Sequence, residues 1–362
     1  MWSLTISHFL ISWNSMILRS LRLRDFRNFE ERVFHFESGK NLIIWNNWVW
    51  KTNVLEALAL PQSYLVEGNP LYHLSRWKNI SSIQYDFDRE HLLYTYTKSE
   101  NKKRYFSEKK IISKKKFQTH YPHIISFYPQ MMDLLYGSPS ERRNFLDTLL
   151  CQSFPEYAHL LQHYKKVLTS RNKILARIYE WKSQASELQF WDTQYLELSI
   201  SIYTYRDKIV SYIKNHITEL IIYFFGKVEY IDFQYISKTP ETQRWDYLTS
   251  YIKEHHEKEV YQRKTLRGPH LDDFMIVVDD IPIEHFASRW EIKSILLWFT
   301  FLWGNFIQDC SVKKDILFLI DDIFSELDTL HLDMIYSYIW TRQCIISSIR
   351  DISDEEVNKI YL

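Results

Sequence analysis

Apolar and polar residues alternate along the first part of the chain, which is the pattern of strands with one buried face. The alternation covers residues 16–36, and a second apolar stretch follows a turn at 41–44. A further strand-like region, rich in Tyr, Phe and Ile, covers 83–127 and is interrupted by the polar run 101–116. These patterns predict β-sheet, whereas residues 1–15 match no element and are expected to be an artefactual or disordered extension.

The hydrophobic period changes to three and four residues in the middle of the chain, as in amphipathic helices. This spacing covers 140–178 and again 188–225, so we expect an antiparallel pair of helices. Strand patterns return after Gly226 and helix signals follow Ala287. The apolar run 316–320 has the composition of a buried parallel strand.

Together these elements predict an α/β fold whose chain is split in two. Residues 16–135 and 230–362 would form one α/β domain, and residues 136–229 a helical lobe inserted into it. A length of 362 residues is long for a single compact core and suits two modules.

The composition excludes several classes of protein. Lysine and arginine together number 45, as do aspartate and glutamate, so the charge is balanced. A nucleic-acid partner would therefore have to bind at a local basic patch. Three distant cysteines without a CxxC pair argue against a disulfide framework or a zinc site. No run reaches the length of a membrane helix and the first residues lack a signal peptide, so we expect a cytoplasmic protein.

Glycine is unusually rare and tryptophan unusually common in this chain. There are 6 glycines and 13 tryptophans, whereas an average glycine usage of about 7% predicts roughly 25 glycines in a chain of this length.

The segment after 41–44 resembles a phosphate-binding loop, which has the pattern G-x-x-x-x-G-K-[ST] between a strand and a helix. Here the segment is Trp45-Asn46-Asn47-Trp48-Val49-Trp50-Lys51-Thr52. The pattern is complete if Trp45 and Trp50 are read as glycine. Trp48 lies at a position where many such loops have a third glycine. Glycine is needed because the loop turns through positive φ and brings backbone N–H groups to the phosphates. The alternative is an apolar turn with a chance Lys-Thr pair.

Two further segments favour a nucleotide site. Asp321 and Asp322 follow the apolar strand, where a carboxylate can hold Mg²⁺ together with the Thr52 hydroxyl. The segment Ser288-Arg289-Trp290-Glu291 opens a helical stretch, and Trp290 stands where a tight helix start that faces an anion would favour glycine.

With these segments the chain resembles the RecF family, recombination-mediator ATPases of bacteria that are related to SMC-type and ABC-type ATPases. The resemblance is carried by LRDFRN (23–28), the loop 45–52 with the VLEA that follows it, GSPSERRNFLD (137–147), SRN (170–172), FWD (190–192), GPHLDD (268–273), SRWEIK (288–293) and LIDDIFSELD (319–328). Each segment is weak alone, but their order and spacing together are specific. They extend across almost the whole chain from Met16.

The resemblance implies the fold of an ABC/SMC-type P-loop ATPase head with an inserted helical lobe. It also implies an ATP-dependent clamp that binds gapped DNA as a homodimer bridged by ATP, hydrolyses ATP slowly, and loads RecA together with RecO and RecR. Residues 288–291 of one subunit would close over the ATP of the other, with a D-loop at 325–328 in the same interface.

Individual residues have expected roles in such a site. Lys51 would contact the β- and γ-phosphates, and Asn46, Asn47 and the loop backbone would line them. Asp322 would orient or deprotonate the attacking water.

Some residues near these segments have two interpretations each. Gln130 is either part of a Q-loop or lies in a surface turn. Ser347 or Ser348 either senses the γ-phosphate or ends a strand, and His270 is either a switch histidine or orders its turn.

The departures from the RecF pattern all have the same form. The resemblance implies glycine where this chain has Trp45, Trp48, Trp50 and Trp290, while Trp191 stands where the family tends to have tryptophan. We therefore expect that UGA codons, which mean glycine in a recoded bacterial lineage, were translated here as tryptophan. The alternative is a lineage that lost ATP binding. It requires several independent substitutions of glycine by tryptophan, while the pairs Lys51-Thr52 and Asp321-Asp322 were retained.

A basic run occurs in this otherwise neutral chain, because eight of the fifteen residues from 102 to 116 are Lys or Arg. We expect phosphate contacts with DNA from Lys102, Lys103, Arg104, Lys114, Lys115 and Lys116. The alternative is a solvated hairpin.

Other function classes remain as alternatives. An ABC transporter subunit is disfavoured because Glu-Ile-Lys follows Trp290, where transporters have Gly-Gly-Gln. An SMC-like structural clamp is disfavoured because the helical insertion is too short for a long coiled coil. A DNA-binding module without ATP activity follows if the tryptophans are real.

Overall fold

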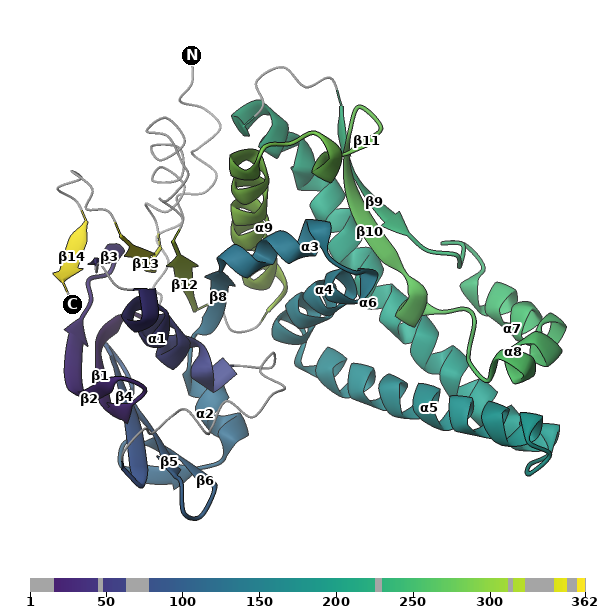
Figure 1. Cartoon of the computed structure of the whole chain (residues 1–362), viewed down its shortest axis with the longest axis horizontal. Coiled ribbons are helices and arrows are strands. Elements are labelled where there is room, and N and C mark those ends of the chain that lie inside the picture. The colour runs from purple at the N-terminus through teal and green to yellow at the C-terminus, as the bar shows by residue number, and fades with distance from the viewer. Residues whose placement is uncertain are drawn as a thin grey trace. The chain divides into compact units, whose positions relative to one another are not determined.

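The structure of the protein is a computed structural model. It describes residues 16–44, 48–62, 78–224, 230–311, 315–322, 342–349 and 357–361. The chain forms two compact units, one of residues 1–129 and 312–362 and the other of residues 130–311 (Figure 1). The second unit holds the predicted lobe together with the elements up to residue 311, so the predicted boundaries of head and lobe stay a prediction.

The first unit contains a parallel five-stranded sheet with the strand order β14-β3-β13-β12-β8. Its strands are β3 (Lys40–Ile44), β8 (His123–Phe127), β12 (Ile316–Asp321), β13 (Cys344–Ser348) and β14 (Asn358–Tyr361). The apolar run 316–320 forms β12, which is buried at every position, as predicted. Because all strands run the same way, their carboxyl ends meet at one edge of the sheet.

The same unit contains an antiparallel sheet with the order β2-β1-β4-β5-β6-β7. The strands are β1 (Leu18–Phe26), β2 (Phe29–His35), β4 (Ile80–Phe87), β5 (His91–Thr97), β6 (Lys102–Ser107) and β7 (Lys110–Ile112). The predicted alternation at 16–36 is confirmed by the pairing of β1 with β2. The polar run 101–116 does not interrupt the sheet but forms β6, β7 and the start of α2 (Lys114–His120). It is polar because this edge is largely exposed.

One hydrophobic core joins these layers in the first unit. It is built from both sheets and from α1 (Trp48–Ala59), and includes Leu21, Leu23, Val54, Leu58 and Leu319. This packing holds α1 against the parallel sheet.

The second unit is mainly helical. Its helices are α3 (Asp133–Tyr136), α4 (Pro139–Ser153), α5 (Pro155–Tyr179), α6 (Leu188–Phe224), α7 (Arg244–Glu254), α8 (His256–Gln262) and α9 (Arg289–Cys310). A small antiparallel sheet has the order β11-β10-β9, from β9 (Ile231–Ile236), β10 (Asp273–Val278) and β11 (Ile281–Pro282). Short 3₁₀ helices lie at Leu60–Gln62 in the first unit and at Pro129–Met132, Ala185–Glu187, Pro269–Leu271 and Ile283–His285.

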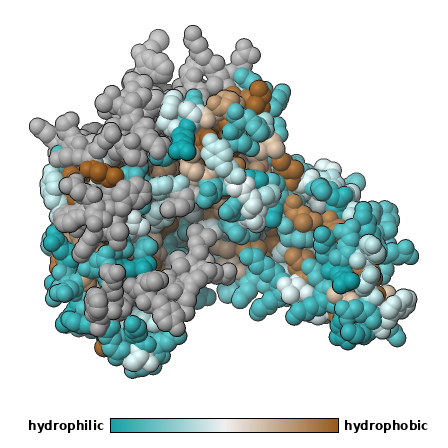
Figure 2. Space-filling view, viewed as in Figure 1, coloured by the Kyte–Doolittle hydropathy of each residue, from teal (hydrophilic) through white to brown (hydrophobic). Residues whose placement is uncertain are grey.

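The predicted helix pair is α5 and α6, which pack side by side (Figure 1). Helices α7 and α8 were not predicted from the pattern, although α7 buries Leu248 and Ile252 on one face. Figure 2 shows mainly hydrophilic side chains over this part of the surface. Within the described ranges, no helix combines the length and the apolar character needed to cross a membrane.

Candidate nucleotide site

The carboxyl edge of the parallel sheet carries residues predicted for phosphate and metal binding. β3 ends at Ile44 and α1 begins at Trp48, so a helix follows the strand as in a phosphate-binding motif, but this helix begins within the predicted loop 45–52. Strand β13 lies between β3 and β12. Its residue Ser348 pairs with Ile44 at the end of β3, and its residue Ser347 pairs with Asp321 at the end of β12. Ligands of open α/β sheets bind outside this edge.

Thr52 and Asp321 meet at this edge, although 269 positions separate them in the chain. The Thr52 hydroxyl donates to Asp321 Oδ2 at 3.5 Å, and Asp321 is 5% exposed. A hydroxyl and a carboxylate are the hard oxygen ligands that Mg²⁺ prefers, and Mg²⁺ usually takes its remaining ligands from water and phosphates. The two side chains therefore fit a Mg²⁺ site that is completed by a nucleotide.

Ser347 fixes both acidic residues of this edge. Its buried hydroxyl donates to Asp321 Oδ1 and accepts the N–H of Asp322 at 3.2 Å. The Ser347 carbonyl accepts the same N–H, also at 3.2 Å. Asp322 has φ 49°, in the left-handed region that aspartate adopts more readily than most residues other than glycine. Ser347 is thus a positioning residue for Asp321 and Asp322.

Several predicted residues lie outside the described part of the chain. These are Trp45, Asn46 and Asn47, the D-loop at 325–328 and the extension 1–15, and only the backbone is described for Trp48, Val49, Trp50, Lys51 and Gln130. Their contacts stay predictions.

The segment from Ser288 to Glu291 forms the start of α9. The Ser288 hydroxyl accepts the N–H of Glu291 at 3.4 Å, and the Glu291 carboxylate accepts the N–H of Ser288 at 2.7 Å. This capping box satisfies two backbone donors at the helix end. Arg289 is exposed and Trp290 is half-buried. The predicted helix start is confirmed, while its contact with a nucleotide stays a prediction.

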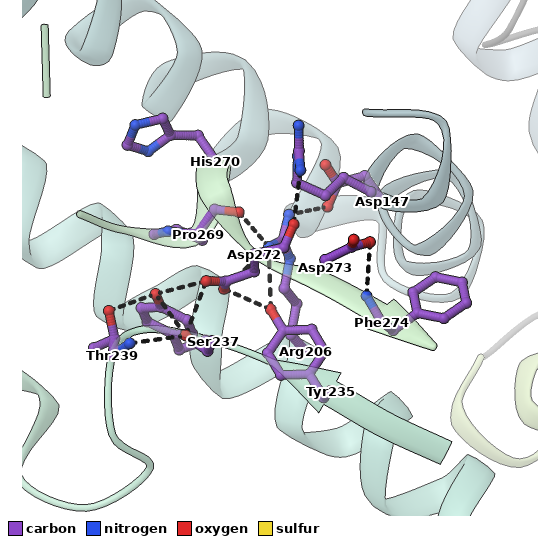
Figure 3. A network of polar contacts seen from close by, with 12 residues as sticks. Asp147, Arg206, Tyr235, Ser237, Thr239, Pro269, His270, Asp272, Asp273 and Phe274 are labelled. Carbon is purple, nitrogen blue, oxygen red and sulfur yellow. Dashed lines mark hydrogen bonds and ion pairs between the residues drawn. The ribbon is translucent and has the colours of Figure 1, made fainter. Parts of the chain in front are cut away.

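Two of the RecF-like segments contribute to a buried polar network in the second unit (Figure 3). Arg206 of α6 donates to Asp147 at 3.0 Å and to the carbonyl of Pro269 at 2.6 Å. Asp272 accepts from the Tyr235 hydroxyl at 2.7 Å. Burial raises the pKa of the Asp272 carboxyl, while the hydrogen bond from Tyr235 and the charge of Arg206 oppose this shift. The network joins α4, α6 and the turn before β10.

Two further arginines of the RecF-like segments pair with acidic residues. Arg142 donates to both carboxylate oxygens of Asp273, at 2.6 and 2.9 Å. Arg171 is fully buried and donates to Asp192 at 2.8 Å and to Glu259 at 2.6 Å. Buried charges require such partners. These residues therefore hold the second unit together, a role that the sequence did not indicate.

His270 lies beside this network. Its Nδ1 is 2.7 Å from the Tyr164 hydroxyl, and its Nε2 is 3.2 Å from the carbonyl of Thr265. Burial lowers the pKa of His270 to about 4, against the effect of the Thr265 hydrogen bond. This surrounding supports the interpretation that His270 orders its turn.

We expect His270 to make the protein less stable as the pH falls from about 7 to about 4. The pKa of histidine is about 6.5 in an unfolded chain and that of His270 is about 4 in the folded protein, so the unfolded state alone gains a proton in this interval. This protonation lowers the free energy of unfolding by about 3 kcal/mol at the acid end of the interval. Urea denaturation at both ends of the interval should show a smaller acid-dependent loss for His270→Gln than for the parent. An equal loss in the two proteins would contradict the assignment.

The basic run lies at the edge of the antiparallel sheet. Lys102 and Lys103 are exposed on β6, and Lys114–Lys116 are exposed in the first turn of α2. The two ends of the run lie close together because α2 packs beside β6. Partial burial and the nearby charge of Lys114 lower the pKa of Lys103. Arg104 differs, because its guanidinium is paired with Glu100 at 2.9 Å.

The architecture and the carboxyl-edge site define an α/β protein with a strand–loop–helix motif and a long helical insertion. A solved structure of the recombination mediator protein RecF with ATPrS, of the RecFOR pathway, has this fold, with a TM-score of 0.83 at 20% identity over 97% of each chain. A structure of RecF with ATP gives a TM-score of 0.82 at 21% identity over 96% of each chain.

Sequence comparison leads to one family. No protein-family model matches the chain. It is 26% identical over 337 residues to the DNA replication and repair protein RecF of Nostoc punctiforme, covering 86% of this chain and 87% of the relative. It is also 26% identical over 346 residues to the RecF protein of Lachnoclostridium phytofermentans, covering 92% of each. The chain is thus similar to RecF proteins of DNA replication and repair over most of its length.

Proposed function

We propose that the protein is an ATP-dependent DNA clamp that acts in recombinational repair and replication restart in the cytoplasm. It binds gapped DNA as a homodimer bridged by ATP, and it promotes RecA loading together with proteins of the RecO and RecR type. The approach of Thr52 to Asp321 beside the start of α1 carries the ATP part of this proposal. The relatives in DNA replication and repair, and the RecF structure with ATP, support it.

The residues at the carboxyl edge then have distinct tasks. The Lys51 ammonium group balances the charge of the β- and γ-phosphates, whose oxygens accept from backbone N–H groups of the loop. Thr52 and Asp321 hold Mg²⁺, which offsets the phosphate charge when bound. Asp322 accepts a proton from the attacking water, and Ser347 keeps its backbone in place.

This function requires glycine at positions 45, 48, 50 and 290 of the natural protein, which we propose on the loop pattern and on the composition. Glycine lets the loop backbone turn through positive φ and approach the phosphates. With tryptophan at these positions the protein would be a DNA-binding module without ATP activity.

Replacing Asp321 or Asp322 singly by asparagine, in the protein with these glycines, should separate the effect on ATP binding from the effect on ATP hydrolysis. Asp321→Asn should remove the strengthening of ATP binding by Mg²⁺, because a metal ligand is lost. Asp322→Asn should keep that effect but lower the hydrolysis rate by about 10²- to 10⁴-fold, the usual contribution of a general base. Titration with a fluorescent ATP analogue, with and without EDTA, and phosphate release measure the two effects. The assignment is wrong if both variants respond to EDTA as the parent does.

Replacing Lys114, Lys115 and Lys116 together by Gln should weaken binding to unrelated DNA duplexes alike. The slope of log K against log salt should become shallower by about 0.9 for each DNA phosphate that the variant no longer neutralises. Arg104→Gln is the matched control, because that guanidinium is already paired with Glu100 and should change the slope little. Fluorescence anisotropy over a range of salt concentrations measures the slope. An unchanged slope in the triple variant would show that these lysines are only a solvated face.

A further inference from the structure

The end of α5 has a tryptophan where its backbone favours glycine. Among the described residues, eleven that are not glycine have a positive φ, and ten of them are polar. The exception is Trp181, with φ 58°. This left-handed conformation is unfavourable for residues with a Cβ, and bulky residues rarely adopt it.

The hydrogen bonds around Trp181 are those of a Schellman motif. The N–H of Trp181 donates to the carbonyl of Ile178 at 3.0 Å, and the N–H of Lys182 donates to the carbonyl of Arg177 at 2.8 Å. In this motif the residue that follows the helix cap is left-handed and is usually glycine. Trp181 occupies that position after the cap at Glu180.

The indole of Trp181 gains nothing from burial to offset this conformation. The residue is 95% exposed, although tryptophan is highly buried on average. Trp191 is different: it lies within α6, is half-buried and packs against Phe190 with ring centroids 5.2 Å apart. The structure therefore separates a tryptophan that suits its position from one that does not.

We infer that residue 181 is glycine in the natural protein, encoded by the same reassigned codon as positions 45, 48, 50 and 290. The inference stands on a helix end in the second unit and on the shortage of glycine in the chain. It uses neither the RecF pattern, which has no segment at 181, nor ATP binding. Glycine there would restore the usual residue of the motif and remove an exposed apolar surface from the end of α5.

The direct test is mass spectrometry of the peptide that spans residue 181, from the protein isolated from its own organism. We expect the mass for glycine, and a mass for tryptophan would overturn the inference. The peptide that spans residue 50 is measured in the same experiment. Tryptophan at 181 with glycine at 50 would overturn only this inference. Glycine at 181 with tryptophan at 50 would overturn the proposed ATP site and the shared codon, but would confirm glycine at the end of α5.

Denaturation of the recombinant chain tests the physical argument separately. Trp181→Gly should raise the ratio of folded to unfolded protein by about 5- to 30-fold, because glycine adopts the left-handed conformation without the steric cost that a Cβ brings. Trp181→Ala removes the indole but keeps the Cβ, so it should give no comparable gain. The control Trp191→Gly should lower the ratio, because it places glycine within a helix and removes a packed ring. Equal gains from Trp181→Gly and Trp181→Ala, or a loss from Trp181→Gly, would overturn the argument.

Discussion

Changing Trp45, Trp48, Trp50 and Trp290 together to glycine should give the recombinant protein an affinity for ATP that it otherwise lacks. Hydrogen bonds to charged groups contribute about 1.5–3 kcal/mol each. A loop that cannot offer two of its N–H groups therefore binds about 10²- to 10⁴-fold more weakly. Isothermal titration with ATP and Mg²⁺ compares the two proteins directly.

Two controls make this result specific to the loop. Lys51→Ala in the glycine-containing protein should abolish the acquired binding, because the phosphate charge is no longer balanced. Trp191→Gly alone should confer none, because this residue lies in α6 of the second unit. If the protein with all four tryptophans binds ATP as tightly as the glycine variant, the reassignment is unnecessary for function. If neither protein binds ATP, the chain is a DNA-binding module.

Local patterns in the sequence are sufficient to predict much of the fold. The alternation in β1 and β2, the uniform burial of β12 and the helical period of α5 and α6 all have direct counterparts in the structure. The start of α9 is predictable because Ser288 and Glu291 have the spacing of a capping box, which is a local interaction.

Contacts that depend on tertiary structure cannot be predicted in this way. Ser347 reaches Asp321 only because β12 and β13 pair in one register, and no local pattern specifies that register. Arg206 lies within a long helix and in no recognisable segment, yet it is the partner of Asp147. The sequence predicts the basic run as one surface, but Arg104 pairs with Glu100 in the turn before β6.

ATP should bring two copies of the glycine-containing protein together. If residues 288–291 contact the nucleotide of the other subunit, ATP binds the dimer more tightly than the monomer, and dimerisation depends on ATP by linkage. Sedimentation velocity with and without ATP should show dimers only with the nucleotide. Asp322→Asn should accumulate them, because hydrolysis no longer releases the subunits.

The decisive variants must spare the helix start. Ser288→Arg should abolish dimers, but it also removes a cap that contributes about 1 kcal/mol to stability. Arg289→Glu is the cleaner change, because Arg289 is exposed and lies outside the capping box, while a carboxylate there repels the triphosphate. Ser288→Thr keeps a hydroxyl cap and should dimerise as the parent does. Ser288→Arg and Arg289→Glu should still bind ATP as monomers, since Lys51 and Asp321 are unchanged. Dimers of Arg289→Glu with ATP, or equal dimerisation of the parent without nucleotide, would rule out the clamp mechanism and leave an obligate dimer or a monomeric binding protein.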